Sequence, residues 1–248
     1  MSKVMLITGA SRGIGAATAR LAASEGYSLC LNFHRRQDAA QQLLEELQRN
    51  GTRAIAIAAD VADEAQVANL FAAIDDEFGR LDVLVNNAGM LERQMRLDEM
   101  DAARLMRVFS VNVTGSFLCA REAVKRMSTR YGGNGGAIIN VSSIAAKLGA
   151  PNEYIDYAAA KGAIDSMTLG LAKEVAAEGI RVNAVRPGVI NTDIHASGGE
   201  PGRVERVRSS VPMGRGGEAE EVAEAILWLA SEKASYASGA LLDVSGGR

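Results

Sequence analysis

Cysteine is scarce in this chain, because Cys30 and Cys119 are the only two among 248 residues. Two cysteines this far apart provide neither a disulfide framework nor the ligands of a metal cluster. We therefore expect two buried thiols without chemistry, and no metal site.

Long apolar runs and a dominant charge are also missing. No stretch approaches the length of a membrane span, and the N-terminus leads from Met-Ser-Lys directly into residues 4–7 without the apolar region of a signal peptide. A net charge of -3 provides no electrostatic footprint for nucleic acid. These absences predict a cytoplasmic protein that binds neither membranes nor nucleic acid.

The chain does contain an alternation of short apolar segments and amphipathic helices, with no linker or repeat. Its length and its 48% hydrophobic residues suit one large domain. The pattern predicts a single-domain α/β protein, a doubly wound Rossmann sheet of seven parallel strands with helices on both faces. The expected strands are residues 4–7, 28–33, 54–59, 81–85, 137–141, 181–186 and 240–244, and the expected helices include 16–23, 37–50, 64–78, 101–130, 157–178 and 218–231.

A glycine-rich turn, Thr8 to Gly15, joins the first strand to the first helix. Gly9, Gly13 and Gly15 let the backbone turn tightly and let a ligand approach without obstruction by Cβ atoms. The free N–H groups at the start of the following helix favour a phosphate. A glycine turn in this context indicates nucleotide binding more specifically than the glycines alone.

The residues after the second strand predict which nucleotide is bound. Many dinucleotide folds place an acidic residue there to bind the ribose 2′-hydroxyl, but here Phe33 is followed by His34, Arg35 and Arg36. A guanidinium at this point suits a 2′-phosphate, and Arg12 adds a second charge. We therefore expect a preference for NADP(H) over NAD(H), the alternative being a solvated basic loop.

Several polar residues follow the other strands. Asp60 is placed to reach a base edge of a nucleotide, Asp63 to cap the helix over residues 64–78, and the amides of residues 86–89 to touch a ribose. Asn112 interrupts the long helix 101–130, so it either points to solvent or has a function, and the residues alone favour solvent. Residues 190–202 form a flap over this edge, in which His195 is expected to be exposed.

Tyr157 and Lys161 form the pair to which the other motifs point. The spacing places a phenol and an ammonium on one helix face, one turn apart. Moving a tyrosine pKa from roughly 10 to near neutrality requires about 4 kcal/mol of phenolate stabilisation. A lysine about 4 Å away in a partly desolvated pocket supplies an effect of that order. The pair predicts an acid catalyst, provided that the fold encloses it.

Taken together, the motifs resemble the short-chain dehydrogenase/reductase family over essentially the full length. The similarity is strongest to the bacterial subgroup that includes 3-oxoacyl-carrier-protein reductases and glucose-1-dehydrogenase-like enzymes. The matching motifs, in the family's order, are Thr8-Gly9-Ala10-Ser11-Arg12-Gly13-Ile14-Gly15, Asp60-Val61, Asn86-Asn87-Ala88-Gly89, Asn112, Ser143, Tyr157-Ala-Ala-Ala-Lys161 and Pro187-Gly188.

The resemblance implies a role for each catalytic residue. Tyr157 is the general acid or base, Lys161 lowers its pKa and holds the nicotinamide ribose, and Ser143 hydrogen-bonds the carbonyl. Asn112 anchors a proton-relay water, which reverses the solvent interpretation. One extra residue in the segment before Tyr157 makes Ser142 the alternative serine, whereas Tyr154 is excluded because Ala158 lies four residues on.

The same resemblance implies a cofactor site and an assembly. The expected function is hydride transfer between NADP(H) and a carbonyl or secondary alcohol, and the alternatives are a catalytically idle NADP(H)-binding sensor or assembly module and another nucleotide-binding enzyme on this fold, such as a methyltransferase. A homotetramer is expected through helices 101–130 and 157–178. The cofactor-binding residues are Gly9, Ser11, Arg12, Gly13, Ile14, Gly15, Arg35, Asp60, Val61, Asn87, Ala88, Gly89, Tyr157, Lys161, Pro187, Ile190 and Thr192.

Overall fold

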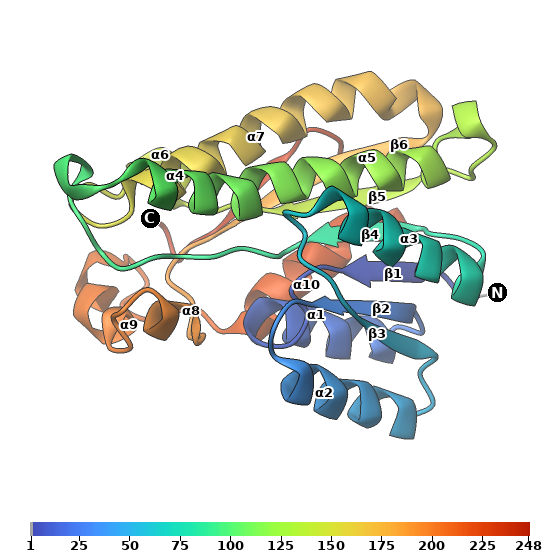
Figure 1. Cartoon of the computed structure of the whole chain (residues 1–248), viewed down its shortest axis with the longest axis horizontal. Coiled ribbons are helices and arrows are strands. Elements are labelled where there is room, and N and C mark those ends of the chain that lie inside the picture. Colours follow the sequence, from blue (N-terminus) through green and yellow to red (C-terminus); the bar gives the residue numbers. More distant parts are fainter. Residues whose placement is uncertain (1) are drawn as a thin grey trace.

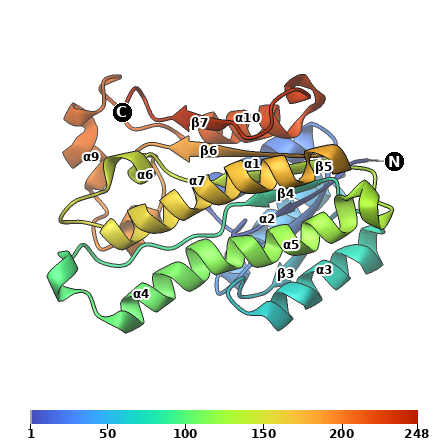
Figure 2. The same ribbon diagram turned by 90° about the horizontal axis from the view of Figure 1, so that it is seen from above.

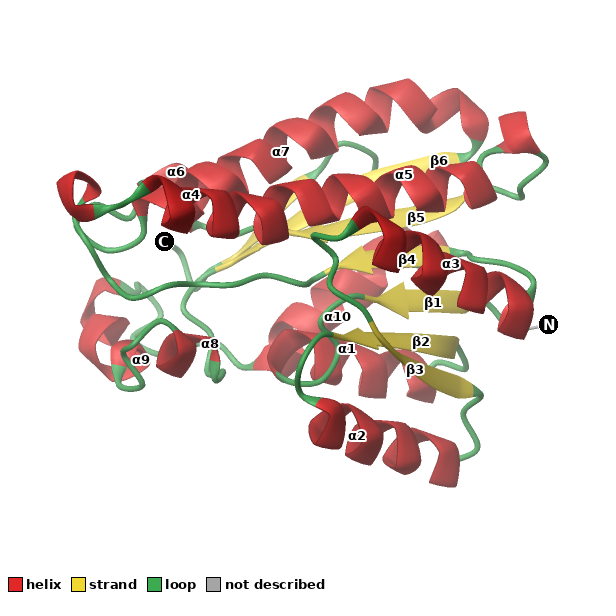
Figure 3. Ribbon diagram, viewed as in Figure 1, coloured by secondary structure: helices red, strands yellow, loops and turns green. Residues whose placement is uncertain are grey.

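The computed structural model describes residues 2–248 and contains one seven-stranded sheet (Figures 1 and 3). All the strand pairs are parallel, and the strand order is β3-β2-β1-β4-β5-β6-β7. The predicted doubly wound sheet is confirmed. The strands are β1 (Val4–Ile7), β2 (Ser28–Phe33), β3 (Ala54–Ala58), β4 (Val83–Asn86), β5 (Gly136–Val141), β6 (Ile180–Pro187) and β7 (Leu241–Val244).

Helices cover both faces of the sheet (Figures 1 and 2). On one face α1, α2 and α10 pack against it, and on the other α3, α5 and α7 do. The helices are α1 (Gly13–Ser24), α2 (Gln37–Arg49), α3 (Glu64–Phe78), α4 (Ala102–Phe109), α5 (Gly115–Met127), α6 (Ala145–Leu148), α7 (Ile155–Val175), α8 (Ile194–Ser197), α9 (Arg203–Val207) and α10 (Ala219–Ala230).

Strand β1 explains why the expected strands are continuous apolar runs. Met5 and Ile7 pack into the core on the α1 side, while Val4 and Leu6 pack into the core on the α3 side. Side chains alternate across a strand, so a strand buried on both faces needs apolar residues at every position.

The predicted helix 101–130 is interrupted in the structure. Helices α4 and α5 are separated by a π-helical turn, Ser110–Thr114. Asn112 lies in this turn, and its amide donates to the Val108 carbonyl at 2.9 Å. A side-chain donor thus takes a carbonyl of the preceding helical turn, which accounts for the local departure from α-helix.

The glycine-rich turn and the polar residues that follow the strands lie at the carboxyl edge of the sheet. The short helices α8 and α9 lie beyond this edge in Figure 1, next to the start of α7 and the C-terminus. Within residues 2–248 no helix is long and apolar enough to cross a membrane.

Candidate active site

The glycine turn between β1 and α1 is built for close approach. Gly9 and Gly13 have φ values of 64° and 53°, which a side chain disfavours. A Cβ atom on Gly15 would lie 2.5 Å from the Gly9 carbonyl oxygen and 2.6 Å from Nδ2 of Asn87. Gly15 therefore allows packing behind the turn, while the side chain of the N-cap residue Arg12 makes no capping hydrogen bond to α1. An uncapped helix start of this kind suits a phosphate.

Hydrogen bonds hold the turn against the end of β4. The Thr8 hydroxyl accepts from the N–H groups of Asn87 and Ala88 at 3.0 and 2.9 Å. In return the Asn87 amide donates to the carbonyls of Thr8 and Gly9 at 2.8 and 3.0 Å. Sequence analysis missed Asn32, whose Oδ1 accepts from the Gly9 N–H at 3.3 Å. The sequence signal for Asn32 is a single amide within the mostly apolar strand Ser28–Phe33.

A cleft of about 850 Å³ opens above this turn. Asp60 lies in its wall, where Oδ1 accepts from the Ala62 N–H at 3.0 Å and Oδ2 is 3.9 Å from His34 Nε2. Asp63 caps α3 as expected, accepting from the Gln66 N–H. Gly15 is not in the wall of the cleft; the predicted cofactor residues that line it are Gly9, Ser11, Arg12, Gly13, Ile14, Arg35, Asp60, Val61, Asn87, Ala88, Gly89 and Thr192.

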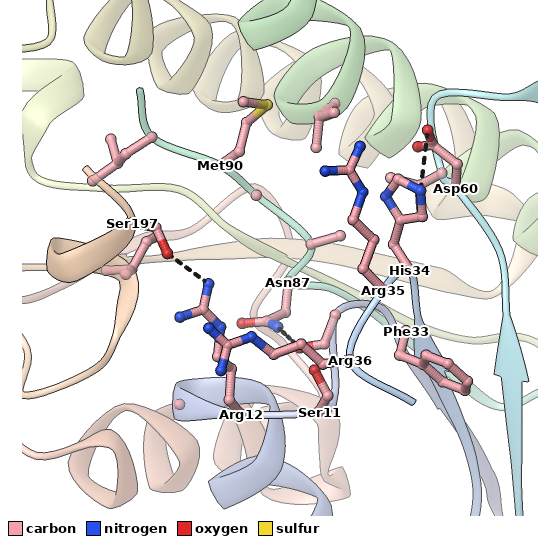
Figure 4. A pocket seen from close by; sticks show the side chains of 18 of the residues that line it. Ser11, Arg12, Phe33, His34, Arg35, Arg36, Asp60, Asn87, Met90 and Ser197 are labelled. Atoms are coloured by element: carbon pink, nitrogen blue, oxygen red, sulfur yellow. Dashed lines mark hydrogen bonds and ion pairs between the residues drawn. The ribbon is translucent and has the colours of Figure 1, made fainter. Parts of the chain in front are cut away.

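Two guanidiniums meet on one side of the cleft (Figure 4). Arg36 turns toward Arg12, whereas Arg35 extends the other way beside His34 (Figure 4). Nη1 of Arg12 and Nη1 of Arg36 lie 3.8 and 3.9 Å from the same oxygen, Oδ2 of Asp193. Burial and then the charge of Arg36 lower the pKa of Arg12. We call Arg12 and Arg36 the arginine pair; the prediction named Arg35, although Arg36 stands next to it in the same basic run.

A second cavity of about 600 Å³ adjoins the first and shares Ile14, Asn87, Gly89 and Thr192 with it. Ser143, Tyr157 and Lys161 line this cavity together with the predicted residues Pro187 and Ile190. The fold thus encloses the phenol and the ammonium beside the cleft above the glycine turn, where a nucleotide was expected. This is the condition that the Tyr–Lys spacing required.

Tyr157 and Ser143 both line the second cavity, and the Ser143 side chain acts to lower the pKa of the phenol. Lys161 lies 5.5 Å from the centre of the Tyr157 ring, and its ammonium donates to the Val141 carbonyl at 2.7 Å. Ser142 is turned away from the phenol, because its hydroxyl donates to the backbone carbonyl of Lys161 at 3.1 Å. The geometry therefore places Ser143 rather than Ser142 at the phenol.

The pKa values of Tyr157 and Lys161 differ from those expected for an acidic phenol beside a charged lysine. Burial raises the pKa of Tyr157 to about 12, against smaller lowering effects of the Ser143 hydrogen bond and the charge of Arg203. Burial also lowers the pKa of Lys161 to about 8, opposed by the charge of Asp165. Desolvation is the largest cause of both shifts, so the phenol is protonated at neutral pH.

Asn112 is fully buried, so the solvent interpretation was wrong. Its amide donates to the Met90 carbonyl and its Oδ1 accepts from the Met90 N–H, both at 3.1 Å. A Cβ atom on Gly89 would lie 2.9 Å from this Oδ1 and 3.6 Å from Nζ of Lys161. The bare backbone of Gly89 therefore lets the asparagine and the lysine approach the same point.

His195 was expected to be exposed, and this was also wrong. The side chain is buried and its Nε2 lies 2.9 Å from the Ile190 carbonyl oxygen. Burial lowers the pKa of His195, with an opposing effect of that hydrogen bond. The segment folds back on itself as helix α8, which a glycine-rich sequence does not indicate.

Charged residues connect the flap, residues 190–202, and α9 to the segment before Tyr157. Glu153 pairs with Arg203 at 2.6 Å and with Arg206 at 2.7 Å. The guanidinium of Arg203 lies over the ring of Tyr154 at 4.9 Å, and the Tyr154 hydroxyl donates to the Gly198 carbonyl at 3.3 Å. These contacts close one side of the second cavity, so the chain before Tyr157 and the flap shape it together.

Known proteins resemble this chain along nearly its whole length. Residues 9–248 match the family model described as "Enoyl-(Acyl carrier protein) reductase". An uncharacterised oxidoreductase, YgfF of Escherichia coli, is 57% identical, with 99% of each chain covered. A cis-4-hydroxycyclohexanecarboxylate dehydrogenase of Sinomonas cyclohexanicum is 43% identical, covering 99% of this chain and 96% of the relative.

Solved structures show the same likeness. A 3-ketoacyl-(acyl-carrier-protein) reductase from Brucella melitensis complexed with NADH has a TM-score of 0.92 at 34% identity, covering 99% and 98% of the two chains. A short-chain dehydrogenase from Burkholderia cenocepacia in complex with NADP has a TM-score of 0.90 at 32% identity, covering 99% and 97%. The chain belongs to the short-chain dehydrogenase/reductase family. It is an oxidoreductase of the class that acts on alcohol and ketone groups with a nicotinamide cofactor.

Proposed function

We propose that this protein is an NADP(H)-preferring enzyme that interconverts a carbonyl and a secondary alcohol, with Tyr157 as general acid and base. One observation carries the proposal: Ser143, Tyr157 and Lys161 line one cavity, and this cavity adjoins the cleft above the glycine turn. A carbonyl oxygen that binds both hydroxyls lies beside that cleft.

Tyr157 acts as the proton donor in the reductive direction. When bound in the cleft above the glycine turn, a nicotinamide cofactor would supply the hydride for the carbonyl carbon. The protonated phenol gives its proton to the carbonyl oxygen, and the Ser143 hydroxyl donates a hydrogen bond to the same oxygen as negative charge develops on it. Proton transfer gives the product alcohol, and Tyr157 remains as a phenolate. Oxidation requires the phenolate at the start, and burial raises the pKa of Tyr157 to about 12.

Lys161 and Asn112 support the phenol. The Lys161 ammonium, fixed by the Val141 carbonyl, faces the Tyr157 ring and stabilises the phenolate that forms when the proton leaves. The buried Asn112 is fixed by Met90 and lies close to the lysine across Gly89, so a water held there would let Lys161 exchange protons.

The preference for NADP(H) rests on the arginine pair. Two guanidiniums beside the glycine turn match the charge of a 2′-phosphate, and Arg35 adds a third in the cleft wall. The residues that follow β2 are His34, Arg35 and Arg36, so no carboxylate is present there to bind a ribose 2′-hydroxyl. The substrate is a small carbonyl or secondary alcohol compound, since the second cavity has about 600 Å³.

The Tyr157→Phe variant tests the catalytic role. It removes only the phenolic oxygen, so we expect turnover to fall by about 10²–10⁴-fold, the typical contribution of a positioned acid. The measurement is NADPH oxidation with a panel of cyclic hydroxy- or oxo-carboxylates, sugars, steroids and 3-oxoacyl thioesters.

NADPH affinity of the same variant is the control and should stay within about two-fold of wild type, because the ring remains in place. Turnover above a few percent of wild type would contradict the acid assignment. A wild-type protein that binds NADPH but consumes no carbonyl on the panel would instead support the idle binding module.

A further inference from the structure

The flap reaches across the nucleotide cleft to the arginine pair. The single oxygen Oδ2 of Asp193 lies between the two guanidiniums, 3.8 Å from Arg12 and 3.9 Å from Arg36. One turn further along, the Ser197 hydroxyl accepts a hydrogen bond from Nη2 of Arg12 at 3.1 Å, drawn as a dashed line in Figure 4. The flap thus presents an oxyanion and a hydroxyl to the two cations.

The same flap also touches the glycine turn and the second cavity. The Thr192 methyl group lies 3.2 Å from where a Cβ atom on Gly13 would be. Asp193 and Ser197 line the nucleotide cleft, His195 lines the cavity of Tyr157, and Ile194 lines both. One short segment, residues 192–197, therefore joins the arginine pair to the wall of the second cavity.

The contacts of Asp193 are weak enough to be exchanged. Its side chain is 64% exposed and its distances to both arginines approach the limit of an ion pair. Exposed pairs of this kind contribute little to stability. In the described chain Nη1 of Arg12 is buried and makes no hydrogen bond. The arginine pair can therefore still donate a hydrogen bond to a ligand. A phosphate monoester brings three acceptor oxygens and a charge of about −1.5 to −2, more than one carboxylate oxygen supplies.

We propose that Asp193 is an internal competitor for the 2′-phosphate of NADP(H) and thereby a determinant of cofactor selectivity. The inference rests on the NADP(H) preference proposed above. Binding of the 2′-phosphate to the arginine pair displaces Asp193 and Ser197 and frees the flap, whereas NAD(H) leaves these contacts in place. By thermodynamic reciprocity, contacts that hold the flap on the arginine pair weaken 2′-phosphate binding to the same degree.

The first experiment measures the affinities of the full chain for NADPH and NADH by isothermal titration calorimetry. Asp193→Asn removes the competing charge, so we expect NADPH to bind about two- to five-fold more tightly, as fits the loss of a weak exposed pair. NADH affinity should stay within about two-fold of wild type. The matched control is Glu205→Gln, which removes one negative charge from α9 at an exposed side chain paired with Arg208. It should leave both affinities unchanged.

The second experiment follows the flap by hydrogen exchange without relying on turnover. Saturating 2′,5′-ADP, which carries the 2′-phosphate but no nicotinamide, should speed amide exchange in residues 193–199, and 5′-AMP should not. In Asp193→Asn this segment should exchange faster even without a nucleotide. Equal exchange with both nucleotides would overturn the displacement.

The two proposals fail in different ways. If the wild-type chain binds NADH as tightly as NADPH, and Arg36→Gln changes neither affinity, the NADP(H) preference is wrong and the competitor role falls with it. If the preference holds but Asp193→Asn binds NADPH no more tightly than wild type, only the competitor role is wrong. Weaker NADH binding by Asp193→Asn would mean that Asp193 binds the ribose, which also overturns the role.

Discussion

Two ionisable groups at the centre of the site are held away from their ordinary pKa values by burial. The Tyr157 phenol keeps its proton to about pH 12, and the Lys161 ammonium loses its proton at about pH 8. Both shifts favour the neutral form, which is the sign that desolvation produces. At neutral pH the phenol therefore carries its proton, and the lysine is still mostly charged.

The lowered pKa of Lys161 predicts a pH dependence of stability. Between about pH 8 and its ordinary value of 10.5, the unfolded chain binds this proton and the folded chain does not, so the free energy of unfolding rises with pH. We expect wild type to gain about 1–3 kcal/mol relative to Lys161→Met between pH 7 and pH 10.5. Urea denaturation of both proteins across this range measures the gain.

Lys125→Met is the control, because it removes an exposed lysine of α5 that pairs with Glu122. This variant should follow the wild-type pH profile. Parallel profiles for wild type and Lys161→Met would show that burial does not destabilise the ammonium.

Among the helices, α4 and α7 are joined by a buried ion pair next to Tyr157. Nε of Arg104 donates to Asp156 Oδ2 at 2.8 Å, and the two side chains are 4% and 1% exposed. Arg104 also donates to the Arg93 carbonyl at 2.6 Å, and Asp156 Oδ1 accepts from the Tyr157 N–H at 2.9 Å. The pair therefore ties α4 and the segment after β4 to the first turn of the helix that carries the phenol.

Removing one partner of this pair should be costly. Arg104→Met leaves the Asp156 carboxylate buried without a counter-charge, and we expect a loss of about 3–5 kcal/mol in the free energy of unfolding. The comparison is Arg107→Met on the same helix, since Arg107 pairs with Glu92 at 2.7 Å and is half exposed. That exposed pair should contribute no more than about 1 kcal/mol. Equal losses for the two variants in chemical denaturation would contradict the role of burial.

The molecule as a whole presents apolar side chains on the helices that cover the α3 side of the sheet. Met106, Phe109, Phe117 and Leu169 belong to α4, α5 and α7 and are exposed in the single chain. Exposed apolar residues gathered on neighbouring helices are typical of protein interfaces. They agree with the tetramer that the family resemblance predicts through these helices.

Phe117→Glu tests this assembly, because a carboxylate buried between subunits has no partner. We expect light scattering of the wild-type protein to give a tetramer and that of the variant a smaller species. Tyr131→Glu, at an exposed position after α5, should remain tetrameric. A monomeric wild-type protein would refute the prediction.

Local patterns in the sequence determined the seven strands and their alternation with helices, the glycine turn and the Asp63 cap. They also determined that Ser143, Tyr157 and Lys161 lie at one edge of the sheet. These features follow from periodicity and from residues with one strong backbone preference, which neighbouring residues along the chain reveal. They also follow from the rule that parallel strands end at the same edge.

Tertiary structure alone decided the orientation and charge of the side chains in the site. It placed Arg36 rather than Arg35 beside Arg12, buried Asn112 and His195, and kept the phenol protonated. Each of these outcomes depends on atoms brought together from distant parts of the chain. Burial and distance set both a side chain's direction and its pKa, and neither quantity exists until the chain has folded.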